Sequence, residues 1–174
     1  MITAKTIIEF NAQLNEYKYG CIQGTFPDDY RSIEPSLFDR VKKGVCWDFV
    51  AFQAYYFTKM FPLIKYKFYY LEAKDGELCH SFMIFRSGLD EYCIFESCKH
   101  PKGIRRFKHV NDALDYEVKL LVDRSGWGYA PYIIYEYELP KEYNLDCCDY
   151  MKHVYHTGKM LRNNRDYYDI IRGV

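Results

Sequence analysis

The sequence predicts an α+β fold in which an N-terminal group of helices packs on an antiparallel sheet. Three observations predict it. Apolar residues recur at helical spacing as far as residue 60, the spacing changes to strand alternation after Pro62, and short glycine-containing turns join the strands that follow. Strands joined by such turns are antiparallel neighbours. With 174 residues and no internal repeat or linker, we expect residues 1–174 to form a single domain.

The composition indicates a folded protein rather than a disordered chain, because 49% of the residues are hydrophobic and 28% are charged. Lys plus Arg and Asp plus Glu balance at 24 each, so the charge gives no reason to expect nucleic acid or an anionic membrane as a partner. The N-terminus lacks the features of a signal peptide, and no apolar run approaches the roughly 20 residues that span a bilayer. Seven cysteines without a secretion signal are expected to be reduced thiols, which predicts a cytoplasmic protein.

The first expected helix begins with a capping box, in which Thr6 is the N-cap and Glu9 reaches back to it. Phe10 and Leu14 then lie on one apolar stripe, and Gly20 is expected to end the helix. We expect this helix to pack on the core and to take no part in chemistry.

Two further helices precede the sheet. The first begins at Pro35, a residue favoured at the first helical position, and Gly44 closes it. The second begins at Cys46 and ends before Pro62, because the residue before a proline avoids the helical conformation. Cys46 is therefore expected at the head of a long helix.

The remaining elements alternate between strands and helices. Three strands are expected at residues 66–71, 78–86 and 91–97. Residues 101–106 are expected to form a loop. Beyond it, the pattern predicts a helix that begins at the N-cap Asn111, a strand over residues 131–139 and a final helix over residues 147–161.

Cys46 occupies a position that suits a catalytic thiol. A thiol in the first turn of a helix lies near the positive end of the helix dipole and near unpaired N–H groups, and both favour the nucleophilic thiolate. His80 and Glu96 follow on neighbouring strands. Side chains alternate between the faces of a sheet, and we expect both residues to face the Cys46 helix, with Glu96 beside His80 beneath the thiol.

The chain resembles the transglutaminase-like branch of the papain-like cysteine protease superfamily over residues 6–123. The resemblance rests on the order of three motifs, which are GVCWD at Cys46, CHSFMIF at His80 and YCIFES at Glu96. It implies that Cys46 attacks an acyl carbon, that His80 takes the thiol proton and later protonates the leaving amine, and that Glu96 orients the imidazole. Glu96 stands where this family commonly has Asp. An upstream Gln commonly completes the oxyanion hole in papain-like enzymes, so the resemblance implies Gln23 as a donor beside the backbone N–H of Cys46.

The expected function is thiol-dependent acyl transfer through a thioester, without a cofactor. We favour hydrolysis of a peptide or isopeptide bond in a peptide or protein substrate, because nothing in the chain marks a site for an acceptor amine. Two alternatives stay open. One is a transglutaminase-type acyltransferase, and the other is a catalytically silent peptide-binding module of the same fold.

A zinc site is a competing interpretation, because several soft ligands lie close together in the sequence. One group consists of Cys79, His80, Cys93, Cys98 and His100, and a second of Cys147, Cys148, His153 and His156. Strand alternation directs the side chains of Cys79 and His80 to opposite faces of the sheet, and neither group contains a Cys-x-x-Cys pair. We therefore expect no metal.

Overall fold

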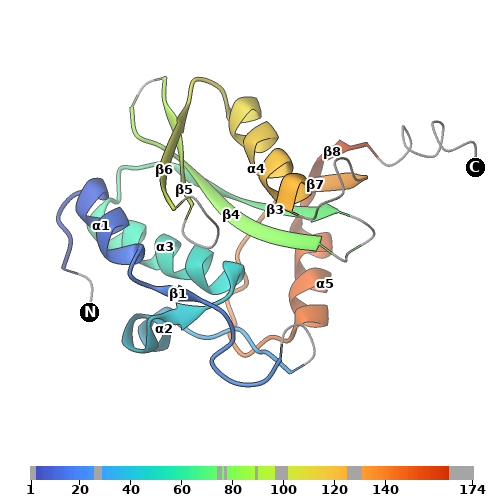
Figure 1. Ribbon diagram of the computed structural model, residues 1–174, viewed down its shortest axis with the longest axis horizontal. Coiled ribbons are helices and arrows are strands. Elements are labelled where there is room, and N and C mark those ends of the chain that lie inside the picture. The colour runs from blue at the N-terminus through green and yellow to red at the C-terminus, as the bar shows by residue number, and fades with distance from the viewer. Residues whose placement is uncertain are drawn as a thin grey trace, which may run out of the picture.

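One antiparallel sheet lies between two layers of helices in the structure, a computed structural model of the chain (Figure 1). The structure describes residues 3–25, 29–73, 76, 78–88, 90–96, 102–124 and 131–164. Its helices are α1 (Ile7–Leu14), α2 (Pro35–Val41), α3 (Cys46–Met60), α4 (Val110–Arg124) and α5 (Cys147–Thr157). Its strands are β1 (Lys18–Tyr19), β2 (Lys43–Gly44), β3 (Tyr66–Ala73), β4 (Leu78–Arg86), β5 (Tyr92–Glu96), β6 (Gly103–Phe107), β7 (Tyr132–Tyr137) and β8 (Lys159–Asn163).

The main sheet has six strands in the order β6-β5-β4-β3-β7-β8, and every neighbouring pair is antiparallel. β3 and β4 lie at its centre, with residues from Tyr66↔Phe85 to Ala73↔Leu78 in continuous register. A separate parallel pair joins β1 to β2 and fixes the backbone immediately before α3. No helix in the described part of the chain is long and apolar enough to cross a membrane.

The sheet is buried on both faces. On one face Met83 and Phe85 of β4 pack with residues of α3, and the rings of Phe57 and Phe85 lie 5.0 Å apart. On the other face Phe82 and Ile84 of the same strand pack with α4. α4 thus forms the second helical layer, on the opposite side of the sheet from α3 (Figure 1).

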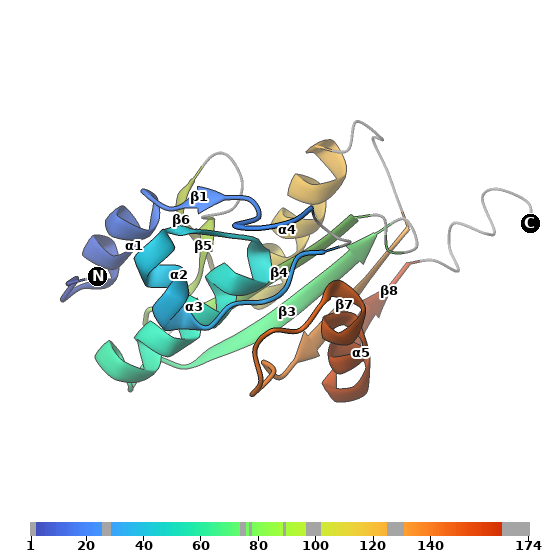
Figure 2. The same cartoon turned by 90° about the horizontal axis from the view of Figure 1, so that it is seen from below.

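α5 lies on the α3 side of the sheet and beside β7 (Figure 2). Its Tyr150 and Val154 are buried in a third apolar cluster with Trp47 of α3 and Tyr137 of β7. The N-terminal ends of α3 and α5 therefore meet over one region of the sheet.

Several elements form where the sequence predicts them. The capping box is present, with the Glu9 N–H donating to Thr6 Oγ1 at 3.1 Å and the Thr6 N–H donating to Glu9 Oε2 at 3.2 Å. α2 begins at Pro35 and α3 begins at Cys46, as predicted. β4 has the predicted bounds of residues 78–86.

The predicted helix ends were wrong at two glycines. α1 ends at Leu14 rather than near Gly20, because the chain turns there to form β1. α2 ends at Val41, and Lys42 takes the left-handed conformation with φ 52° that ends the helix. Gly44 belongs instead to β2.

Two regions have a different secondary structure from the prediction. Residues 103–107 form the edge strand β6 instead of a loop. The predicted helix over residues 147–161 ends at Thr157 and is followed by the edge strand β8. Gly158 separates the two elements, and a Cβ atom there would lie 2.4 Å from the Val154 carbonyl oxygen.

Candidate functional site

Cys46 is the first residue of α3 and is 5% exposed. Val45, the N-cap residue of α3, precedes it in an extended conformation. The backbone N–H groups of the first helical turn have no acceptor within the helix, and the helix dipole places partial positive charge beside them. The predicted position of the thiol is confirmed.

Asp48 anchors this helix start. Its carboxylate is 1% exposed and accepts hydrogen bonds from the Val45 N–H at 2.8 Å, the Tyr30 O–H at 2.6 Å and the Ile33 N–H at 3.1 Å. Burial raises the pKa of Asp48 to about 6, although the three hydrogen bonds act in the opposite direction. Gly44 makes room for this carboxylate, since a Cβ there would lie 2.8 Å from Asp48 Oδ2.

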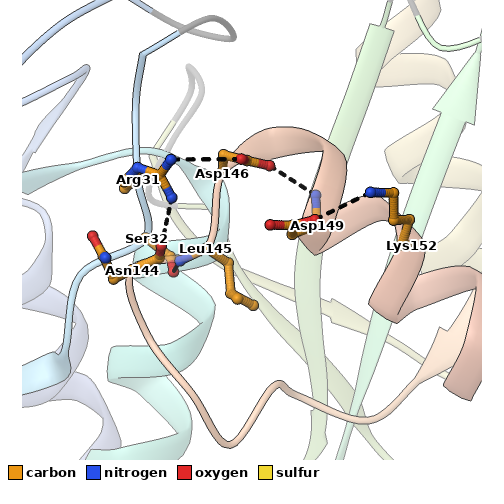
Figure 3. Close-up of polar contacts among 7 residues, drawn as sticks. All are labelled: Arg31, Ser32, Asn144, Leu145, Asp146, Asp149 and Lys152. Atoms are coloured by element: carbon orange, nitrogen blue, oxygen red, sulfur yellow. Dashed lines mark hydrogen bonds and ion pairs between the residues drawn. The ribbon is translucent and has the colours of Figure 1, made fainter.

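A polar clamp holds the loop before α2 against the loop before α5 (Figure 3). Ser32 exchanges backbone hydrogen bonds with this second loop, donating to the Leu145 carbonyl at 2.8 Å and accepting from the Asn144 N–H at 2.8 Å. The Leu145 N–H also donates to Ser32 Oγ at 3.0 Å. Arg31 donates to the Asn144 carbonyl at 3.0 Å and lies 3.7 Å from the carboxylate of Asp146, the N-cap of α5.

The clamp and Asp48 form one connected unit. Tyr30 and Ile33, which donate to Asp48, flank Arg31 and Ser32, which contact the α5 loop. The position of Cys46 at the start of α3 is thereby fixed relative to the start of α5.

An aromatic wall lies between the two helix starts. Trp47 packs against Tyr150 in a tilted arrangement with ring centroids 4.5 Å apart, and the Tyr150 and Tyr137 hydroxyls are 2.7 Å apart. Burial raises the pKa of both phenols, and the nearby Cys46 adds to the effect. Both phenols are therefore protonated donors at neutral pH. Trp47 is 4% exposed and packs the helix start, as its position beside the thiol predicts.

Two further thiols lie in the same region. Burial raises the pKa of Cys79 to about 12, and neighbouring groups that include Cys46 contribute to the shift. Burial also raises the pKa of Cys147, the first residue of α5, with Cys46 again nearby. Both thiols are therefore protonated at neutral pH and are poor competitors for an electrophile.

A cavity of about 220 Å³ opens beside this site. Gln23, Tyr30, Arg31 and Asn144 are among the residues that line it. Tyr30 lines the cavity and donates a hydrogen bond to Asp48 at the start of α3. Burial raises the pKa of Tyr30, and Cys46 is one of the neighbours that raise it further. Gln23 and this cavity therefore lie near the start of α3, although Cys46 itself does not line the cavity.

The predicted orientation of His80 was wrong. His80 lies on the α4 face of the sheet, where its ring stacks on Phe82 at 5.7 Å and its Nε2 lies 3.5 Å from Glu117 Oε2. Cys79, the neighbouring residue on β4, is the one close to Cys46. Because successive side chains alternate between faces, His80 is directed away from the α3 face.

Glu117 is a functional candidate that the sequence interpretation missed. It is 0% exposed and belongs to α4. A signal was present in the sequence, because residue 117 lies three residues after Leu114 and four before Leu121, on the apolar stripe of that helix. An acidic residue on such a stripe needs a buried partner, and His80 supplies it.

The backbone of Glu96 ends β5 and pairs with Gly103 of β6. Its side chain lies outside the described part of the structure, so the predicted role of Glu96 stays a prediction. Cys98 and His100, which belong to one of the two zinc interpretations, also lie outside it. Within the described residues, no group of three or more His, Cys, Asp or Glu side chains is arranged to hold a metal ion.

Comparisons of the chain with protein-family models, with curated proteins and with solved structures found no match. The fold shown is α+β with an antiparallel sheet, and the papain-like core stays a prediction from the motifs.

Proposed function

We propose that this chain is a thiol-dependent acyl-transfer enzyme with Cys46 as its nucleophile, acting on a peptide or protein substrate. The observation that carries the proposal is the placement of Cys46 at the first residue of α3, where Asp48 fixes the helix start. A cavity lined in part by Gln23 and by Tyr30, which donates to Asp48, supports it by offering space for a substrate near the start of α3. The resemblance of the motif around Cys46 to transglutaminase-like sequences supports the same nucleophile.

The proposed reaction has two steps. Cys46 Sγ bonds to the acyl carbon and the C–N bond breaks, so that a thioester forms and the amine leaves with a proton. Water then attacks the thioester carbon and releases the acid and the thiol. The oxyanion would accept hydrogen bonds from the Cys46 N–H at the helix start and from the Gln23 side chain. An amine in place of water would give the transglutaminase-type product.

His80 has no place in this proposal as the base at Cys46, because it contacts Glu117 on the opposite face of the sheet. The proton of Cys46 is instead transferred through water to the nitrogen of the leaving amine. The buried phenols of Tyr137 and Tyr150 are donors rather than bases, since burial raises their pKa. They can stabilise negative charge near the thiol.

The position of His80 favours a second candidate, a catalytically silent peptide-binding module. In that case Cys46 would be a buried residue at a helix start, and the cavity would hold a ligand without chemistry. The two candidates differ in whether Cys46 forms a thioester.

Acylation by p-nitrophenyl acetate distinguishes the two. We expect a stoichiometric burst of p-nitrophenol from the native chain and an acetyl group on the peptide that contains Cys46. Cys46→Ser should abolish both, and Cys148→Ser, which alters an exposed thiol on α5, should leave both unchanged. Adding an amino acid ester to the reaction would reveal an amide product if an amine replaces water. Acetylation of a different thiol, or no burst, would favour the binding module.

The expected cytoplasmic location belongs to this proposal. All six cysteines within the described part are free thiols, and a reducing compartment would maintain them.

A further inference from the structure

A groove of about 540 Å³ opens at the end of α3 that is remote from Cys46. Ile64 and Tyr66, which follow α3, form one side of it, and Val110 at the start of α4 lies on another. The fifteen residues of α3 span about 22 Å at the helical rise of 1.5 Å per residue. The groove is therefore separate from the thiol site.

The rim of the groove is basic. Lys65 and Arg86 line it and are exposed, and within the described part of the chain Lys65 forms no ion pair. Arg86 lies over the ring of Tyr92 at 5.5 Å. The third cation, Lys67, is neutralised by Glu136 at 2.5 Å. Lys65 thus leaves positive charge at the rim, although the whole chain has no net charge.

The floor carries the hydroxyl group of Tyr69. Tyr69 is 3% exposed, and its ring stacks on Phe82 at 5.6 Å. Its O–H makes no hydrogen bond to any residue that the structure describes, and it lines the groove. Burial raises the pKa of Tyr69, with Glu136 and Tyr92 adding to the effect, so this hydroxyl is a donor at neutral pH. A donor that faces the groove is available to an acceptor group of a ligand.

We propose that the groove binds a small organic anion that has one carboxylate and an aromatic or branched apolar body. The carboxylate would accept a hydrogen bond from Tyr69 and pair with Lys65, and the body would pack on Ile84 and Tyr92. The volume falls within the range of small-molecule sites, roughly 300–1,000 Å³. This inference does not depend on the acyl-transfer proposal, because the two sites share no residue.

Three probes with the same body test the charge requirement. We would titrate the full chain with 4-phenylbutyrate, 4-phenylbutanol and 4-phenylbutylamine and follow the chemical shifts of groove residues by NMR. The carboxylate is expected to bind about tenfold more tightly than the alcohol, and the amine should bind most weakly. Equal affinity for the carboxylate and the alcohol would overturn the proposal.

Matched variants locate the binding site. Tyr69→Phe removes only the hydroxyl, Lys65→Gln removes one rim charge, and each should weaken 4-phenylbutyrate binding about tenfold. Lys152→Gln, on α5 away from the groove, should leave the affinity unchanged. Folding of each variant would be checked by its spectrum without ligand. The proposal is overturned if the variants bind like the native chain, if no shifts occur, or if the shifts map elsewhere.

Discussion

At the scale of single residues, Asp48 determines the geometry of the candidate site. Asp48 lies in the first turn of α3, where a carboxylate complements the helix dipole, and its hydrogen bonds give it a larger role. Its three hydrogen bonds connect the start of α3 to Tyr30 and Ile33, and through them to the clamp at α5. A buried carboxylate with three donors holds the backbone around Cys46 in one arrangement.

The titration of Asp48 should be visible in the pH dependence of stability. Burial raises its pKa from the ordinary 3.8 to about 6, so the folded chain binds this proton more tightly than the unfolded chain. The contribution of Asp48 to the free energy of unfolding therefore falls as the pH rises between about 4 and about 6, by about 3 kcal/mol in total. Above that window the contribution is constant.

The contribution of Asp48 can be measured by denaturant unfolding of the native chain and of Asp48→Asn between about pH 4 and about pH 6. Other groups titrate in both proteins, so the difference between the two stabilities isolates Asp48. That difference should decrease toward pH 6. A difference that does not vary with pH would mean that the carboxyl titrates with an ordinary pKa.

The orientation of His80 yields a second prediction at this scale. His80 and Glu117 are a buried pair, and removing one partner of such a pair typically costs about 3–5 kcal/mol. We expect His80→Gln to lower the free energy of unfolding while the acylation rate of Cys46 in the folded protein stays within about twofold. Glu117→Gln is the matched variant on α4. It should also lower the free energy of unfolding and leave the acylation rate of Cys46 unchanged. A folded His80→Gln protein that no longer acylates at Cys46 would show that the imidazole serves the thiol.

At the scale of elements, β4 explains why the sequence identifies the strand but not its orientation. Its bounds and its alternation could be predicted from the pattern. Residues 80–85 are all buried, because α3 covers one face of the sheet and α4 covers the other. An apolar pattern on both faces cannot indicate which face meets which helix. The assignment of His80 to the α3 face had no physical basis beyond the expected triad.

The end of α5 is a second element that the apolar pattern did not predict, and Gly158 determines where the helix stops. Apolar spacing continues past residue 157, so the pattern predicts a longer helix. Gly158 ends it because only a residue without Cβ fits beside the Val154 carbonyl and the ring of Tyr135. The chain then returns as β8 along the edge of the sheet.

We therefore expect Gly158→Ala to destabilise the fold. The new Cβ would lie 2.4 Å from a backbone oxygen, and relieving such a contact should cost about 1–3 kcal/mol of unfolding free energy. Gly88→Ala is the matched control, because a Cβ there meets nothing within 4 Å, and its effect should stay within about 0.5 kcal/mol. Chemical denaturation of both variants provides the comparison. Equal effects at the two positions would mean that the α5 end adjusts freely.

At the scale of the whole molecule, the candidate site lies where distant parts of the chain meet. Residues 30–33, the start of α3 and the loop before α5 come together only through long-range hydrogen bonds. The sequence could indicate Cys46, because a glycine followed by a helix start is a local pattern. It could not indicate Tyr150 or the clamp, since these positions depend on how α5 packs against α3.

The two helical layers share one sheet and should therefore unfold cooperatively. Leu14 of α1 and Leu114 of α4 are both buried and lie in the apolar clusters on opposite faces of the sheet. Leu14→Ala and Leu114→Ala each remove the same three side-chain carbon atoms beyond Cβ. Each should therefore lower the free energy of unfolding by about 2–5 kcal/mol. If residues 1–174 form a single cooperative domain, either substitution should weaken both helical layers together.

Native-state hydrogen exchange can test this directly. The most protected amides of α3 and α4 exchange through global unfolding, so in each variant both sets should exchange faster by the same factor. The two leucines lie in separate clusters, and the double variant should therefore lose close to the sum of the two effects. Leu114→Ala would have a purely local effect only if α4 detached while α3 stayed on the sheet. Faster exchange confined to α4 would thus contradict a single domain.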